Sequence, residues 1–488
     1  MCRSRLALVA ALAVGTARLA GGQAAIAPVK PLPYTRFVLP NGLTAILNED
    51  HASPIVAIDL YFKIGRRDDT PGRAGIAHLC EHMMGEGSPN LDQPQSVLLR
   101  SLGATSPHFA ATTEDITHYY YALPANQLET ALWVEADRLA NPLGRADSAR
   151  LAAVRPVVAQ ERLQDIDNVP IGSAFEAVVR NLFQQESPYF MIGASPMPDL
   201  PKLTVADLRA ACLPYYVPNN AVLGVSGNFN TATARKLVEK YFGPIARGAD
   251  VKRLPTPAAK LDAEKRIVLE DSRITVPQLR IQWIGAQYDD PDRMGLLAVA
   301  SALSLARFAS DGHLASIGVE PPTSLGRLTK LLVNDRQLAT RVLVDNADMQ
   351  HAGVFEIKVF PRPNVSLTLL ETLVDSVVAS LAKAPITKEE IALFNAYNRV
   401  YLATTLQPHF MRADTLAHDE IFARDPSAYA KQAAAAEKLT PADLDRVVKR
   451  FLVPGRSVLS IVPAGKLDLI SKPSAPYTNV TPPSGLKR

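Results

Sequence analysis

The apolar positions of this chain follow two periods, and each period predicts one kind of element. Residues 37–50 (FVLPNGLTAILNED) and 54–65 (PIVAIDLYFKIG) contain short apolar and β-branched runs, which are typical of strands. The pair Asn41-Gly42 inside the first stretch predicts a hairpin turn. Residues 72–87 (GRAGIAHLCEHMMGEG) then predict a helix, which would be poorly amphipathic without its polar residues.

The chain also repeats one helix–strand unit. The segment that starts at Lys202, KLTVADLRAACLPYYVPNNAVLGVSGNF, matches the segment that starts at Lys438, KLTPADLDRVVKRFLVPGRSVLSIVPAG, at a constant offset of 236 residues. In each copy a threonine can cap an amphipathic helix, a proline can end it, and an apolar run predicts a buried strand. The register has no gap from Lys202 to Pro218, which indicates a duplication.

The repeat predicts two homologous domains, residues 26–250 and 266–470. Residues 251–265 between them are rich in proline and charge, as in a linker, and residues 471–488 predict an unstructured tail. Strands mixed with long helices in each half indicate an α+β fold, in which each domain is a mixed β-sheet flanked by helices.

Residues 1–25 have the parts of a signal peptide. A basic start (MCRSR) precedes an apolar stretch (LALVAALAVG) too short to span a bilayer, and small residues follow around Ala24 and Ala25. This pattern predicts a periplasmic or secreted protein, and a retained N-terminal anchor is the alternative. Removal of the leader leaves 49 basic and 48 acidic residues, so charge gives no reason to expect nucleic acid or a membrane surface as a partner.

Two cysteines, Cys80 and Cys212, remain after the leader, which is too few for a disulfide framework. Whether they pair stays open. Cys80 points away from the polar side of its helix, so we expect a small buried residue there.

The predicted helix places His78, Glu81 and His82 on one face. Histidines at positions i and i+4 can reach one zinc ion at about 2.0–2.1 Å, and the glutamate between them is then free to act as a general base. The alternative is a pair of hydrogen-bonded core histidines. A catalytic zinc site needs a third protein ligand and an open position.

Spacing alone leaves the third ligand open among Glu161, Glu114 and Glu135. The remaining histidines have no ligand-type spacing, and we expect surface or core roles for them: His51, His108, His118, His313, His351, His409 and His418.

The motif His78-Leu-Cys-Glu81-His82 resembles the inverted zinc motif of the pitrilysin-type, or insulinase-type, metallopeptidases. The segments NGLTAILNED, TTEDITHYYYALP, EADRLANP, VVAQERLQDIDNVPIG and GRLTKLLVNDRQLA follow in the family's order. The resemblance implies a Zn²⁺ cofactor held by His78, His82 and Glu161, with Glu81 as the catalytic base. It also implies a metal-free C-terminal domain and, as in the two-domain bacterial and mitochondrial-processing members, a clamshell of two chains.

Three positions depart from the family pattern. An Asn-Ala pair usually binds substrate backbone beside an edge strand, and here Phe109-Ala110 stands in its place. An acidic residue that often assists the site is Val154 here. The substrate-binding Arg–Tyr pair of the C-terminal half keeps Arg327 but has Thr329 for the tyrosine. A homologous subunit could supply the missing pair, which predicts a heterodimer, with a homodimer as the alternative.

These observations predict a zinc endopeptidase that cleaves extended or unfolded peptides in an enclosed chamber. A peptide would add as a strand along residues 105–113. A protease dedicated to one precursor differs only in specificity, and a non-catalytic structural subunit of a larger complex is the alternative from another class. No phosphate-binding loop, G-x-S-x-G elbow or basic–aromatic stripe supports a different chemistry.

Overall fold

The first sheet grows from the predicted hairpin. The computed structural model describes residues 29–106, 109–305 and 325–480. Gly42 turns the chain at φ 93°, a conformation that favours glycine, and a Cβ there would lie 2.6 Å from the Asn219 Cβ. The resulting six-stranded sheet has the order β1-β2-β6-β3-β5-β4. Its strands are β1 (Thr35–Val38), β2 (Thr44–Glu49), β3 (Ile55–Phe62), β4 (Ala110–Thr112), β5 (Thr117–Pro124) and β6 (Ala221–Gly227).

The second sheet repeats this topology, with the order β12-β7-β11-β8-β10-β9. In both sheets an equivalent parallel pair, β2 with β6 or β7 with β11, is followed by antiparallel neighbours. The outer pairs differ, because β1 is antiparallel to β2 while β12 is parallel to β7. The strands are β7 (Lys265–Asp271), β8 (Gln278–Ile284), β9 (Ala339–Asp348), β10 (Gly353–Pro361), β11 (Ser457–Pro463) and β12 (Thr478–Asn479). The two mixed sheets with flanking helices confirm the predicted α+β fold.

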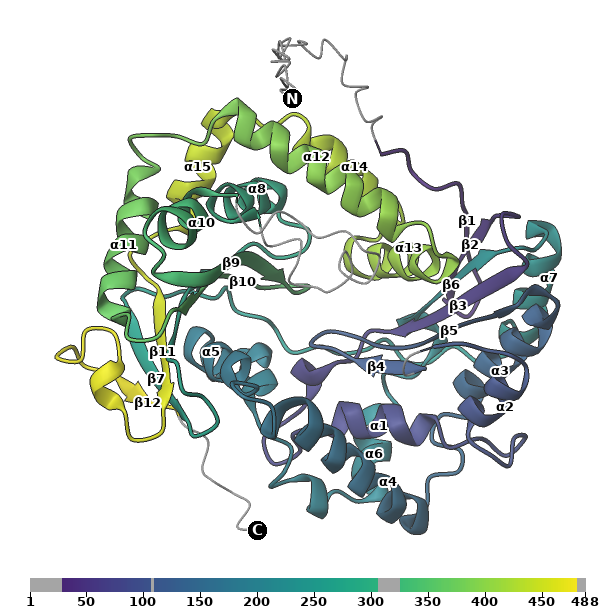
Figure 1. The fold of residues 1–488 in the computed structure, drawn as a ribbon. Helices are drawn as coiled ribbons and strands as arrows, with labels where there is room; N and C mark the ends of the chain where they lie inside the picture. The colour runs from purple at the N-terminus through teal and green to yellow at the C-terminus, as the bar shows by residue number, and fades with distance from the viewer. Residues whose placement is uncertain (1–28, 107–108, 306–324, 481–488) are drawn as a thin grey trace, which may run out of the picture.

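Helices flank both sheets (Figure 1). The repeat is visible in them, since Thr204 and Thr440 both cap helices, α6 and α15, through capping boxes with an aspartate. The helices of the first half are α1 (Ile76–Met84), α2 (Gln95–Ser101), α3 (Leu128–Ala140), α4 (Ser148–Arg162), α5 (Ala174–Leu182), α6 (Val205–Cys212) and α7 (Thr231–Phe242). Those of the second half are α8 (Arg293–Leu303), α10 (Arg327–Thr329), α11 (Leu367–Ser380), α12 (Lys388–Thr405), α13 (His409–Ala423), α14 (Ala428–Ala436) and α15 (Pro441–Phe451).

Each half lends one helix to the sheet of the other half. Helix α13 packs across β3 and β6, and Figure 1 shows it on the opposite side of that sheet from α1. Helix α5 packs on β7, β8 and β11 in the same way. Residues 251–264 contain no helix or strand. They separate the two repeat units. Each half has a large hydrophobic core of its own, and two smaller clusters contain residues of both halves.

The C-terminal segment differs from its prediction. β12 pairs in parallel with β7, and the Lys472 Nζ lies 2.6 Å from a Glu371 carboxylate oxygen. The expectation of an unstructured tail is therefore wrong for residues 471–480, because these contacts anchor the chain. The predicted signal peptide, residues 1–25, lies outside the described residues. Within the described ranges no helix is long and apolar enough to cross a membrane.

Candidate metal centre

Helix α1 carries the histidine motif, and its start is fixed by backbone geometry. Gly75 has a φ of 82°, and a Cβ there would lie 2.5 Å from the Pro196 Cβ. The buried Asp69 carboxylate accepts hydrogen bonds from the backbone N–H groups of Gly75 (2.6 Å) and Ala77 (3.0 Å). Burial raises the pKa of Asp69 to about 7, although these two N–H groups favour its charged form. The carboxylate thus replaces a capping side chain at the first turn.

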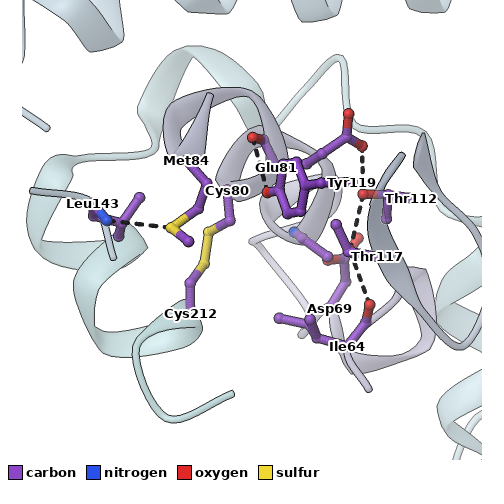
Figure 2. Close-up of a disulfide and its surroundings, with 11 residues drawn as sticks. Ile64, Asp69, Cys80, Glu81, Met84, Thr112, Thr117, Tyr119, Leu143 and Cys212 are labelled. Atoms are coloured by element: carbon purple, nitrogen blue, oxygen red, sulfur yellow. Dashed lines mark hydrogen bonds between the residues drawn. A yellow bond between two sulfur atoms is a disulfide. The ribbon is translucent and has the colours of Figure 1, made fainter. Parts of the chain in front are cut away.

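A disulfide fixes the opposite side of α1 (Figure 2). Cys80 is bonded to Cys212 at the end of α6, and both residues are fully buried. The burial of Cys80 agrees with the sequence prediction, which left the pairing open. Figure 2 shows Cys80 pointing toward α6 while Glu81 points the other way, toward Thr112.

The structure brings His78, His82 and Glu161 together. Glu161 reaches the histidines from the last turn of α4, which packs against α1. Its Oε2 lies 3.0 Å from the His82 Nε2 and 3.3 Å from the His78 Nε2. The two Nε2 atoms are 3.2 Å apart. The donor atoms therefore form a small triangle that is partly open to solvent.

The electrostatics of this triangle match its geometry. Hydrogen bonds from His78 and His82 hold the pKa of Glu161 well below its usual range. Burial lowers the pKa of His82, but the Glu161 hydrogen bond and the nearby carboxylates outweigh it and raise the pKa overall. Glu161 is thus a carboxylate that faces two imidazole nitrogens.

The spacing of the three donor atoms fits zinc. A tetrahedral ion with bonds of about 2.0–2.1 Å separates its ligand atoms by roughly 3.3 Å. The observed separations of 3.0, 3.2 and 3.3 Å lie close to that value. Two imidazoles and one carboxylate are also a donor set that Zn²⁺ accepts, with one position left open.

Glu81 lies beside the triangle and is held from β4. Its side chain is 8% exposed, and its Oε2 is 4.0 Å from the His78 Nε2. The Thr112 hydroxyl donates to the same oxygen at 2.6 Å. Thr112 in turn contacts Thr117 at 3.0 Å, and Thr117 donates to the Ile64 carbonyl at 2.9 Å, as Figure 2 shows. Thr112 could not be predicted as a site residue, since nothing in the TTEDIT segment distinguishes it from the neighbouring threonines.

The other two glutamates considered for the third position lie elsewhere. Glu135 is fully buried and accepts from Arg138 at 2.8 Å and from Tyr121 at 3.1 Å. Glu114 belongs to neither group of potential metal ligands found in the described part of the chain. Spacing could not separate these residues from Glu161, because all three have suitable positions in the sequence.

Of the predicted substrate strand, residues 105–113, the structure forms a strand over Ala110–Thr112, β4, at the edge of the first sheet, and residues 107–108 lie outside the described ranges. Phe109 precedes this strand, and its side chain is buried against Tyr121. The Phe109 side chain is therefore unavailable to a peptide that pairs with β4. Ala111 lies opposite His118 in the ladder, and Tyr120 donates to the Phe109 carbonyl at 3.0 Å. By antiparallel alternation, the backbone groups of Ala110 and Thr112 then point outward.

Arg327 is not brought to this cluster. Its guanidinium donates to Glu390 at 2.7 and 2.8 Å and to the carbonyls of Ala384 (2.6 Å) and Pro385 (2.9 Å). Thr329 is fully buried, and its hydroxyl lies 3.1 Å from the Ser304 hydroxyl. The side chains of Arg327 and Thr329 therefore both form their hydrogen bonds within the C-terminal half.

Comparisons with known proteins identify relatives of this chain. Residues 44–190 match the model of the insulinases, peptidase family M16, and residues 202–393 match the model of the peptidase M16 inactive domain. The zinc protease PqqE of Helicobacter pylori is 26% identical over 368 residues, which cover 73% of this chain and 77% of that protein. The mitochondrial-processing peptidase subunit beta of Blastocladiella emersonii is 27% identical over 290 residues, 58% of this chain and 60% of the relative. The crystal structure of a protease from Helicobacter pylori has the same fold, with a TM-score of 0.76 at 22% identity, over 89% of this chain and 100% of that one.

Proposed function

The chain belongs to the insulinase family of peptidases, family M16, and from this premise we propose that it is a zinc-dependent endopeptidase acting on extended or unfolded peptides. The observation that carries the proposal is the triangle of His78, His82 and Glu161, whose donor atoms are 3.0–3.3 Å apart. A fourth group, Glu81, lies beside the triangle without belonging to it.

In this proposal His78, His82 and Glu161 hold the ion, and Glu81 moves the proton. A bound Zn²⁺ supplies a Lewis acid and brings the pKa of a water molecule toward 7. Glu81 accepts the proton of the attacking water on its carboxylate and returns it to the leaving amine. The Thr112 hydroxyl bonds one oxygen of Glu81, so the carboxylate keeps one orientation during the transfer.

The peptide would add to the sheet as a strand next to β4. The outward backbone groups of Ala110 and Thr112 can pair with an extended peptide without help from side chains. The Thr112 side chain also bonds Glu81, so a peptide paired with β4 would pass close to the proposed base. Backbone pairing favours unfolded or short peptides over folded proteins, whose strands are already paired.

We also propose that a homologous subunit completes the site, in a heterodimer or a homodimer that encloses a chamber. The Arg327 guanidinium is bound to Glu390, and Thr329 is buried where the family has a tyrosine. If the missing hydroxyl stabilises the oxyanion, its loss would lower the rate by about 10²–10³-fold. A related chain with the Arg–Tyr pair would restore that rate.

A periplasmic or secreted location completes the proposal. The leader at residues 1–25 supports it, and so does the Cys80–Cys212 disulfide, because structural disulfides persist mainly in oxidising compartments.

The experiment that tests the function measures zinc content and cleavage of unfolded peptides by the mature chain and by Glu81→Gln. We expect zinc in both proteins and cleavage by the wild type only. If zinc is present but neither protein cleaves, co-expression with related chains should restore activity. Absence of zinc from carefully prepared protein would contradict the proposal and favour a structural subunit.

A further inference from the structure

A second cluster of metal-binding side chains lies on the other face of the first sheet. Ile58, Leu60 and Phe62 of β3 face the core that contains α1, so Asp59 and Tyr61 point to the opposite face. His118 of β5 lies directly opposite Tyr61 in the ladder and points the same way. Helix α13 of the other half covers this face and brings Asp414 to it.

A glycine allows this approach. Gly224 of β6 lies opposite Asp59 in the ladder. A Cβ at Gly224 would be 2.5 Å from the Ala413 carbonyl oxygen, so no larger residue fits beneath α13 at this point. Asp414 follows Ala413 directly, and its carboxylate lies with Asp59 and His118 in one group.

The three side chains converge. The His118 Nδ1 lies 3.0 Å from an Asp59 oxygen and 4.0 Å from an Asp414 oxygen. One donor atom from each residue lies within 4.8 Å of the others, as in the His78–His82–Glu161 triangle. The His118 ring is fixed between Tyr61 (centroids 4.5 Å apart) and Tyr120 (4.6 Å). The Tyr61 hydroxyl donates to Asp414 at 2.6 Å and orients that carboxylate.

The charge of this cluster is not balanced by the protein. Asp59 is fully buried, and its two carboxylate oxygens lie 3.0 and 3.2 Å from the His118 Nδ1. Within the described residues, no lysine or arginine bonds either Asp59 or Asp414. Two carboxylates lie beside one imidazole, and of the two only Asp414 reaches solvent. A cation bound between them would offset the negative charge that the chain leaves without a lysine or arginine.

We propose that Asp59, His118 and Asp414 bind a divalent transition-metal ion, with Zn²⁺ as the natural probe. Two carboxylates and one imidazole are donors that such ions accept, and zinc binds tightly to nitrogen and oxygen sets. Asp414 is 23% exposed and Asp59 is not exposed, so the ion enters past Asp414. The ion joins two strands of the first half to a helix of the second half, and it is independent of the proposed peptidase centre.

The test counts metal ions in the full mature chain after incubation with zinc and removal of free ions. We expect about two zinc ions per chain in the wild type, and about one in His82→Gln, which loses a ligand of the first centre. Adding Asp414→Asn or His118→Gln to His82→Gln should remove the remaining ion. Zinc should also raise the melting temperature of metal-free His82→Gln by more than about 3 °C, and this rise should vanish with either second change.

Asp50→Asn added to His82→Gln is the matched control. Asp50 forms an ion pair with Arg412 of α13, the helix that carries Asp414. Asp50→Asn therefore also breaks a contact with α13 but removes no proposed ligand, so one ion should remain bound. One ion in the wild type and none in His82→Gln would overturn this proposal and leave the peptidase centre intact. One ion in both proteins would support the second site and contradict the peptidase centre.

Discussion

Removal of the Cys80–Cys212 disulfide should destabilise the N-terminal half without moving the proposed zinc ligands. The bond joins α1 to α6 across 132 residues of chain. In the chain-entropy model a loop of this length stabilises the folded state by about 5 kcal/mol at 25 °C, and measured effects are often smaller. We therefore expect Cys80→Ala/Cys212→Ala to lose about 3–5 kcal/mol of unfolding free energy.

The metal site should survive this change because other contacts hold α1. Asp69 binds the first turn through Gly75 and Ala77. At the other end of the helix, the Tyr119 hydroxyl donates to the Glu81 carbonyl at 3.1 Å, and Arg138 donates to the Met84 carbonyl at 3.0 Å. Zinc content and the kcat for peptide cleavage should therefore stay within about threefold of the wild type at 20 °C, since α1 keeps its position.

The measurement is thermal unfolding of the oxidised full chain, followed by circular dichroism at fixed zinc. For a unit of about 200 residues, each kcal/mol shifts the melting temperature by roughly 2–4 °C, so the transition of the first half should fall by about 6–20 °C. Cys212→Ala alone should lose nearly as much, because either change breaks the bond. A shift below about 2 °C, or a loss of zinc at 20 °C, would refute this reasoning.

Three further outcomes follow from other contacts. Thr112→Val removes a hydrogen bond to the buried Glu81 carboxylate. Because hydrogen bonds to charged groups contribute about 1.5–3 kcal/mol, kcat should fall about 10- to 100-fold while zinc is retained. Thr112→Ser keeps the hydroxyl and should stay near the wild type. Burial tends to raise the pKa of Glu371, but hydrogen bonds from Arg266, Lys472 and Ser471 outweigh it and lower this pKa to about 2. Because this folded-state pKa lies below the unfolded value, about 3 kcal/mol of stability should be present above pH 4.5 and lost as the pH falls toward 2. Urea unfolding at several pH values should therefore show that Glu371→Gln loses less stability in acid than the wild type. Chelation with a zinc-specific ligand should abolish cleavage, and stoichiometric Zn²⁺ should restore it; activity that survives complete zinc removal would contradict the metal role.

Local patterns predicted much of the fold. The Asn41-Gly42 turn, the helix that carries His78 and the repeat at an offset of 236 residues all depend on neighbouring residues, and the structure has each of them. β6 and β11 even begin and end at equivalent positions of the two copies, residues 221–227 and 457–463.

Contacts between distant segments could not be predicted in this way. The Cys80–Cys212 bond and the ion pair of Arg327 with Glu390 join residues with no shared local pattern. His118 showed no ligand-type spacing because its neighbours in the cluster lie 59 residues away along the chain or on another half. The family resemblance, rather than spacing, separated Glu161 from its two rivals.

Helices α5 and α13, each of which packs on the sheet of the other half, indicate how this chain arose. They occupy equivalent places in the repeat, since α5 shifted by 236 residues falls within α13. A single unit made alone would leave bare the sheet face that the other unit's helix now covers, so the ancestral unit would have needed a second copy. Two such copies in a symmetric pair would have covered one another. The linker at residues 251–264 would then be the segment that joined the two subunits of an ancestral homodimer. After fusion the two copies no longer needed identical sequences. One kept histidines on α1. In the other, helix α8 packs on α15 as α1 packs on α6, and it is buried from Met294 to Leu303.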